Sequence, residues 1–76
     1  SGVRDMLFEN MTPLTAQVLS QKIQDVINNF EPRAQLAGVE VIPRVDVNMY
    51  EVIIEFYIKN KPAELIDLSF TLERLR

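Results

Sequence analysis

The first half of the chain repeats apolar residues at the spacing of one helical face. Between residues 13 and 30 they recur every three or four positions, at Ala16, Leu19, Ile23, Val26, Ile27 and Phe30. This spacing is typical of an amphipathic helix that buries one side. Thr12 can cap the first turn, and Pro13 suits the first helical position because its φ is fixed and its missing N–H would have no helical partner. We therefore predict a helix over residues 13–30 that packs on another layer.

A shorter apolar stretch precedes this helix. Residues 5–11, DMLFENM, supply two methionines, a leucine and a phenylalanine. Leu14 and Val18 form a second small apolar spot on the helix, away from its main stripe. We expect the preceding stretch to contain a short helical turn and to cover this spot.

From residue 37 onward the apolar period changes from 3.6 to 2, which is typical of strands with one covered face. The alternation predicts strands over about residues 37–47, 49–59 and 64–74. The first covered face would hold Val39, Val41, Pro43, Val45 and Val47. The second would hold Tyr50, Val52, Ile54, Phe56 and Ile58, and the third Ile66, Leu68, Phe70 and Leu72. Because proline offers no N–H to a ladder, the first strand should lie at a sheet edge or carry a bulge.

The simplest assembly of these elements is an α+β fold. We predict a three-stranded antiparallel meander with the second strand central, and the long helix covering the face that carries the valines, isoleucines and phenylalanines. Residues 1–76 are expected to form a single domain. Ser1 and Gly2 resemble an expression remnant, and no Met begins the chain, so we expect a fragment of a longer protein.

Composition removes several classes of function. The chain contains no cysteine and no histidine, which excludes disulfides, thiolate metal sites and the commonest general base. The formal net charge is -3, and the eight Lys and Arg residues are scattered, so the sequence indicates no nucleic-acid surface. No apolar run approaches the roughly 18 residues of a membrane-spanning helix. We expect no metal, no cofactor and no membrane partner.

The stretch NNFEPR stops the helix with two opposite charges around a proline. Pro32 disfavours the helical region at Glu31, so the helix should end near Phe30. Glu31 and Arg33 then point to the same side of an extended segment and can pair. A helix stop with a solvated ion pair, typically contributing about 0–1 kcal/mol, is a sufficient explanation from the residues alone.

Residues 7–43 resemble the small baseplate wedge proteins of contractile-tailed phages, a family that also includes the baseplate E subunit of type VI secretion systems. The resemblance is carried by LFENMTPLTA at the start of the helix, NNFEPR at its end, and V-x-V-I-P in the first strand. Members of this family usually carry a further N-terminal segment. The resemblance therefore agrees with the expectation of a fragment that lacks it.

This resemblance implies a structural role in assembly. It implies that Glu31, Pro32 and Arg33 contact a helical bundle of larger wedge proteins. It also implies that the sheet initiates assembly of the tail sheath, through β-strand addition by arms of the sheath protein. The expected location is the virion tail baseplate, and the host cytoplasm during assembly.

Two other groups of residues have alternative interpretations. Because the family has been associated with lysozyme activity, Glu9 is the best candidate catalytic acid, with the hydroxyls of Thr12 and Thr15 nearby and Asp5 as its partner. An ordinary helix-end charge explains Glu9 more simply, so we predict that the protein is not an enzyme and assign no catalytic residue.

A second group on the outer face of the sheet is either a partner surface or scattered exposed apolar residues: Ile42, Ile53, Tyr57 and Leu65.

Overall fold

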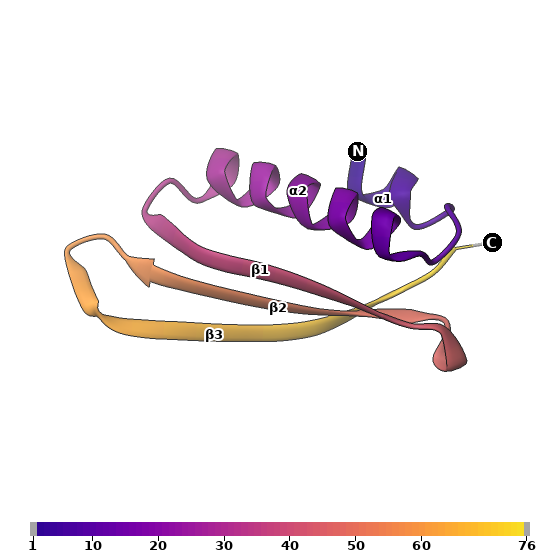
Figure 1. The fold of residues 1–76 in the computed structure, drawn as a ribbon. Helices are drawn as coiled ribbons and strands as arrows, with labels where there is room; N and C mark the ends of the chain where they lie inside the picture. The colour runs from indigo at the N-terminus through magenta and orange to yellow at the C-terminus, as the bar shows by residue number, and fades with distance from the viewer. Residues whose placement is uncertain (1, 76) are drawn as a thin grey trace.

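The protein is a two-layer α+β domain. The computed structural model describes the backbone of residues 2–75 and the side chains of residues 3–4, 6–60 and 64–75. Two helices lie over a three-stranded antiparallel sheet of order β1-β2-β3 (Figure 1). The elements are α1 (Gly2–Met6), α2 (Pro13–Phe30), β1 (Ala34–Arg44), the 3-10 turn η1 (Val45–Val47), β2 (Met49–Ile58) and β3 (Lys61–Glu73). The predicted fold class and the central position of the second strand are confirmed.

Helix α2 has the predicted bounds, and local chemistry explains both of its ends. Thr12 is extended, with φ -124° and ψ 162°, and its hydroxyl oxygen accepts a hydrogen bond from the Thr15 N–H at 3.1 Å. At the other end, Pro32 prevents the preceding residue from continuing the helix. Glu31 has φ -137° and ψ 74°, and its N–H donates to the Ile27 carbonyl at 2.8 Å.

Strand β1 is an edge strand, as the position of Pro43 predicted. The register between β1 and β2 shifts between Leu36 and Gly38, so β1 carries one extra residue at Ala37. The bulge therefore lies well before Pro43. It allows Leu36 and Val39, three positions apart, to lie on the same face of the sheet.

The predicted bounds of the first strand were wrong at both ends. It runs from Ala34 to Arg44 rather than over residues 37–47, while β3 begins at Lys61 rather than near residue 64. Val45 and Val47 were expected on the covered face, but they lie exposed in the turn η1. Asn48 closes this turn in the left-handed region, with φ 58° and ψ 40°. The chain needs these residues to reverse direction, and this requirement overrides the alternating pattern.

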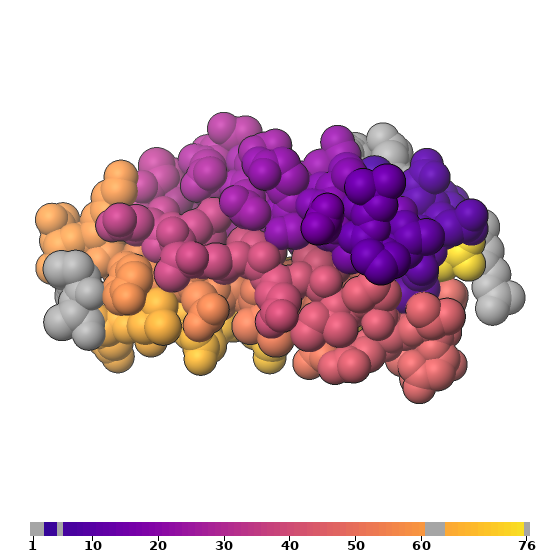
Figure 2. All heavy atoms as spheres, in the orientation of Figure 1, coloured from indigo at the N-terminus to yellow at the C-terminus, as the bar shows by residue number. Residues whose placement is uncertain are grey.

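Seven apolar residues form the buried core between α2 and the sheet: Leu7, Ala16, Leu19, Ile23, Tyr50, Val52 and Ile54. None of them belongs to β3. The prediction that α2 covers the whole apolar face was wrong for this strand, because Leu68 and Phe70 are 53% and 37% exposed. A helix is about 10–12 Å wide and strands are about 4.8 Å apart, so a single helix covers roughly two strands. Figure 2 shows the helical residues and the strands as two layers.

The N-terminal stretch packs against one end of the core and bonds to the C-terminal end of the chain. Helix α1 lies earlier in the chain than the predicted turn over residues 5–11, and Leu7, just after it, enters the core. The Leu7 carbonyl accepts a hydrogen bond from the Leu75 N–H at 2.8 Å, so the two ends of the chain meet (Figure 1). The stretch does not cover the small apolar spot on α2, as Leu14 and Val18 remain exposed. That prediction was wrong.

Candidate partner-binding site

The Glu31-Pro32-Arg33 segment is a tight turn whose backbone is held by hydrogen bonds at Glu31 and Arg33. The Ala34 N–H donates to the Glu31 carbonyl at 3.0 Å, which closes a four-residue turn with proline at its second position. The Arg33 carbonyl accepts from the Lys59 N–H at 2.9 Å, which ties the turn to the end of β2. The turn therefore joins α2, β1 and β2 at one end of the sheet.

The side chains of this turn pair with each other at the surface. Arg33 Nε donates to Glu31 Oε1 at 3.3 Å, as the sequence predicted. The two side chains are 82% and 51% exposed, respectively. Arginine has five N–H donors in a fixed plane, so most of this guanidinium is free for further hydrogen bonds. A surface pair of this kind contributes little to stability. Its geometry is suited to contact with a second molecule.

Residues that the sequence reasoning did not assign to a site surround this turn. Phe30 was expected on the buried helix face, but it is 81% exposed beside Glu31. Arg33 lines a hollow of about 470 Å³ together with Lys59 and Glu64. The signal in the sequence was the position of Phe30 as the last helical residue before a proline stop. This end of the molecule thus presents an aromatic ring, two cations and two carboxylates.

The four apolar residues predicted on the outer face of the sheet do lie on one face. Tyr57 and Leu65 are register partners on β2 and β3, and Ile42 and Ile53 come from the neighbouring strands β1 and β2. Glu55 lies between the two pairs on the same face of β2. The residues therefore form two small pairs rather than a continuous surface. Their role as an interface patch stays a prediction.

The candidate catalytic acid, Glu9, is exposed in the loop before α2. The hydroxyl oxygens of Thr12 and Thr15 lie 3.0 Å apart, and that of Thr12 caps the helix, so both are engaged away from Glu9. Arg74 Nε donates to the backbone carbonyl of Glu9 at 3.1 Å, which gives this residue a structural contact. The side chain of Asp5 lies outside the described residues. Glu9 is therefore an exposed loop residue, and the hydroxyls expected beside it are occupied at the start of α2.

Two further properties limit the chemistry of the described chain. Among the side chains of residues 3–4, 6–60 and 64–75, no three acidic groups lie close enough together to hold a metal ion. In the same part of the chain, neither helix is long and apolar enough to span a bilayer.

One titratable group lies inside the domain. Tyr50 is fully buried, and its hydroxyl has no hydrogen-bond partner among the described residues. Burial raises the pKa of Tyr50 above its ordinary value of 10.0, and the nearby charge of Arg74 acts in the opposite direction. A buried hydroxyl without a partner lowers the stability of the core. Tyr50 is not part of the Glu31–Arg33 turn.

Comparison with known proteins agrees with the sequence resemblance. The chain is 38% identical over 68 residues to baseplate wedge protein gp25 of Enterobacteria phage T4. The alignment covers 90% of this chain and 52% of that protein, so the chain spans about half the length of this relative. The resemblance to the small baseplate wedge proteins is therefore confirmed. No family model matches the chain.

A solved structure has the same fold. It is a protein of Geobacter sulfurreducens described as a candidate tail lysozyme, with a TM-score of 0.87 and 18% sequence identity. The superposition covers 99% of this chain and 68% of that chain. At this identity the match shows a shared fold and carries no statement about activity.

Proposed function

We propose that this chain is the helix-and-sheet part of a baseplate wedge protein in a contractile tail. It docks on a helical bundle of larger wedge proteins through Glu31, Pro32 and Arg33. An edge of its sheet then accepts an extended arm of the sheath protein and so starts sheath assembly. These events take place in the host cytoplasm, before the baseplate becomes part of the finished virion.

The similarity to the T4 wedge protein is the observation that carries this proposal. Because the alignment takes in 68 of the 76 residues, it has to include the Glu31–Arg33 turn, which lies far from both chain ends. The geometry of the turn adds support. Its backbone is fixed by hydrogen bonds to α2 and β2, while its side chains are exposed. A preorganised arginine loses little conformational freedom on binding, which favours affinity.

Substitution of Arg33 tests the docking step. An arginine anchor that becomes desolvated at an interface contributes roughly 2 kcal/mol or more, so Arg33→Ala should weaken binding to the wedge bundle about thirtyfold. Arg33→Lys should fail almost as badly, because an ammonium keeps the charge but lacks the planar set of donors. Glu31→Ala should also weaken binding, since Glu31 orients the guanidinium. Pull-down and calorimetric titration with the purified wedge bundle measure these effects.

Arg44 provides a matched control. It forms the other described surface ion pair, with Arg44 Nη2 2.6 Å from Glu51 Oε1, and it lies at the opposite end of β1. Arg44→Ala should leave wedge binding unchanged, and both arginine variants should lose no more than about 1 kcal/mol of stability. The proposal fails if Arg33→Ala and Glu31→Ala bind the bundle as tightly as wild type, or if Arg44→Ala is equally damaging.

A further inference from the structure

The backbone hydrogen bonds at the two ends of β2 determine which residues face each sheet edge. The Lys59 N–H donates to the Arg33 carbonyl, and the Arg74 N–H donates to the Asn48 carbonyl, both at 2.9 Å. Backbone groups in antiparallel strands alternate in direction from one residue to the next. Odd-numbered residues of β2 therefore face β1, and even-numbered residues face β3.

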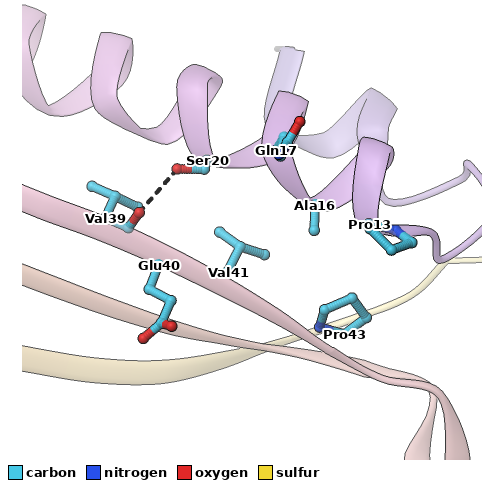
Figure 3. Close-up of a pocket in the computed structure, with 8 residues that line it drawn as sticks. All are labelled: Pro13, Ala16, Gln17, Ser20, Val39, Glu40, Val41 and Pro43. Atoms are coloured by element: carbon cyan, nitrogen blue, oxygen red, sulfur yellow. Dashed lines mark hydrogen bonds between the residues drawn. The ribbon is translucent and has the colours of Figure 1, made fainter.

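This alternation shows that the β1 edge is partly obstructed. Its register with β2 leaves the backbone groups of five residues facing away from the sheet: Ala34, Leu36, Val39, Val41 and Pro43. Pro43 has no N–H to offer, and the Val39 carbonyl already accepts a hydrogen bond from the Ser20 hydroxyl at 3.1 Å (Figure 3). Of these five residues, Leu36 and Val41 keep both a donor and an acceptor for an added strand, because the Ala34 N–H already donates to the Glu31 carbonyl. Helix α2 also lies alongside this edge (Figure 3).

The β3 edge is open over most of the strand. Its outward-facing backbone groups belong to Leu65, Asp67, Ser69, Thr71 and Glu73. None of these is a proline, and all five residues are exposed. An unpaired edge of this length is a template for another strand.

The two faces beside the β3 edge differ in chemistry. On the face that carries α2, Leu68 is exposed, and a groove of about 390 Å³ between α2 and β3 is lined by Val26, Phe30 and Phe70 among other apolar residues. On the opposite face, β3 presents Asp67 and Glu73. Neither carboxylate forms an ion pair with another described side chain. A strand added at this edge would meet an apolar surface on the side of α2 and acidic side chains on the opposite side.

We propose that the β3 edge binds an extended segment of a second protein in which apolar side chains alternate with lysine or arginine. The apolar side chains fill the groove beside Phe70, and the basic ones pair with Asp67 and Glu73 across the new ladder. This proposal rests on the strand addition proposed above, and it specifies the edge and the chemistry of the arm. A second copy of this chain fits less well, because antiparallel pairing centred on Phe70 would set Asp67 opposite Glu73.

Short synthetic peptides test the proposed pattern. The probe is an acetylated peptide about nine residues long with valine and lysine at alternate positions, which matches the span of the outward-facing residues. One control has the same composition with its valines grouped together, and another replaces lysine by glutamate. We expect the alternating valine-lysine peptide to bind at least about tenfold more tightly than either control, by fluorescence anisotropy. Its binding should shift the amide resonances of Ser69 and Thr71.

Matched substitutions at the two edges locate the site. Thr71→Pro removes an outward-facing donor of β3 without removing a bond to β2, and it should weaken peptide binding about tenfold. Val41→Pro makes the same change at the β1 edge and should stay within about twofold of wild type. Asp67→Lys requires no backbone change and should shift the preference toward the glutamate peptide, so the test does not depend on a proline variant folding.

The inference is overturned if the peptides bind equally whatever their pattern, if Val41→Pro removes binding and Thr71→Pro does not, or if the amides of β3 are protected by self-association instead. These outcomes leave wedge docking through Arg33 unaffected. Conversely, loss of the wedge interaction would leave peptide binding at β3 intact.

Discussion

The two ends of the sheet differ in how far their side chains are buried. At the end where α2 begins, Leu19 and Tyr50 are fully buried, and the Leu75 N–H bonds to the Leu7 carbonyl. At the end where α2 stops, Phe30 and the Arg33 side chain are both more than four-fifths exposed. A domain of this size can bury only about 60% of its unfolded surface. The comparison shows that stabilising contacts are concentrated at one end, which leaves apolar and charged groups available for a partner at the other.

The largest expected difference between the two ends is the effect of truncating a helix residue. Leu19→Ala removes a fully buried side chain and should lower the free energy of unfolding by about 3 kcal/mol. Phe30→Ala lies on the same helix and should change it by no more than about 0.5 kcal/mol. Urea denaturation followed by circular dichroism measures both. Equal losses in the two variants would contradict the division between a stabilising end and a binding end.

A smaller effect is expected from the contact that closes the stable end. Arg74 donates from Nε to the Glu9 carbonyl at 3.1 Å and from Nη2 to Asn10 Oδ1 at 3.3 Å. Arg74→Ala should lower the free energy of unfolding by about 1 kcal/mol, because these hydrogen bonds are partly solvated. Arg4 on α1 is the control: its side chain is exposed and forms no described hydrogen bond, so Arg4→Ala should have little effect. A loss as large as that of Leu19→Ala would mean that Arg74 supports the core itself.

The smallest effect at neutral pH is expected for Tyr50→Phe. Its hydroxyl is buried without a described partner, so removing it should leave the free energy of unfolding unchanged or raise it by up to about 1 kcal/mol. The pKa of Tyr50 is raised in the folded state, so the folded protein holds this proton more tightly than the unfolded chain does. The resulting stability is present below pH 10 and is lost as the pH rises through the folded-state pKa. Denaturation between pH 9 and about 11 should show a steeper loss for wild type than for Tyr50→Phe.

The sequence determined the helix more reliably than the sheet because the helix ends depend on local chemistry. Thr12 and Pro13 mark the start and Pro32 marks the stop, and each acts through its own backbone or a neighbour. The pairing of Glu31 with Arg33 was predictable for the same reason. By contrast, Val45 and Val47 continue the alternating pattern into a turn, because periodicity carries no information about where a hairpin must reverse.

The exposure of Leu68 and Phe70 could not be predicted from periodicity either. Their alternation correctly indicates which face of β3 they occupy. Whether that face is covered depends on where α2 crosses the sheet, which is set by tertiary packing on β1 and β2. The free edge of β3 follows from the predicted strand order. The apolar groove beside that edge and the exposure of Phe30 depend on the placement of α2, so the complete strand site became visible only in the assembled fold.

The contact between Leu7 and Leu75 also constrains the order in which the domain can fold. The hydrogen bond from Arg74 to Glu9 joins residues separated by 65 positions, so it encloses almost the whole chain in one loop. Closing such a loop costs more entropy than forming the β1–β2 hairpin, whose partners are near in sequence. Helix α2 and this hairpin can therefore form early, whereas α1 and the end of β3 are joined in a late step. During synthesis on the ribosome, the stable end of the domain cannot be completed until its last strand has emerged.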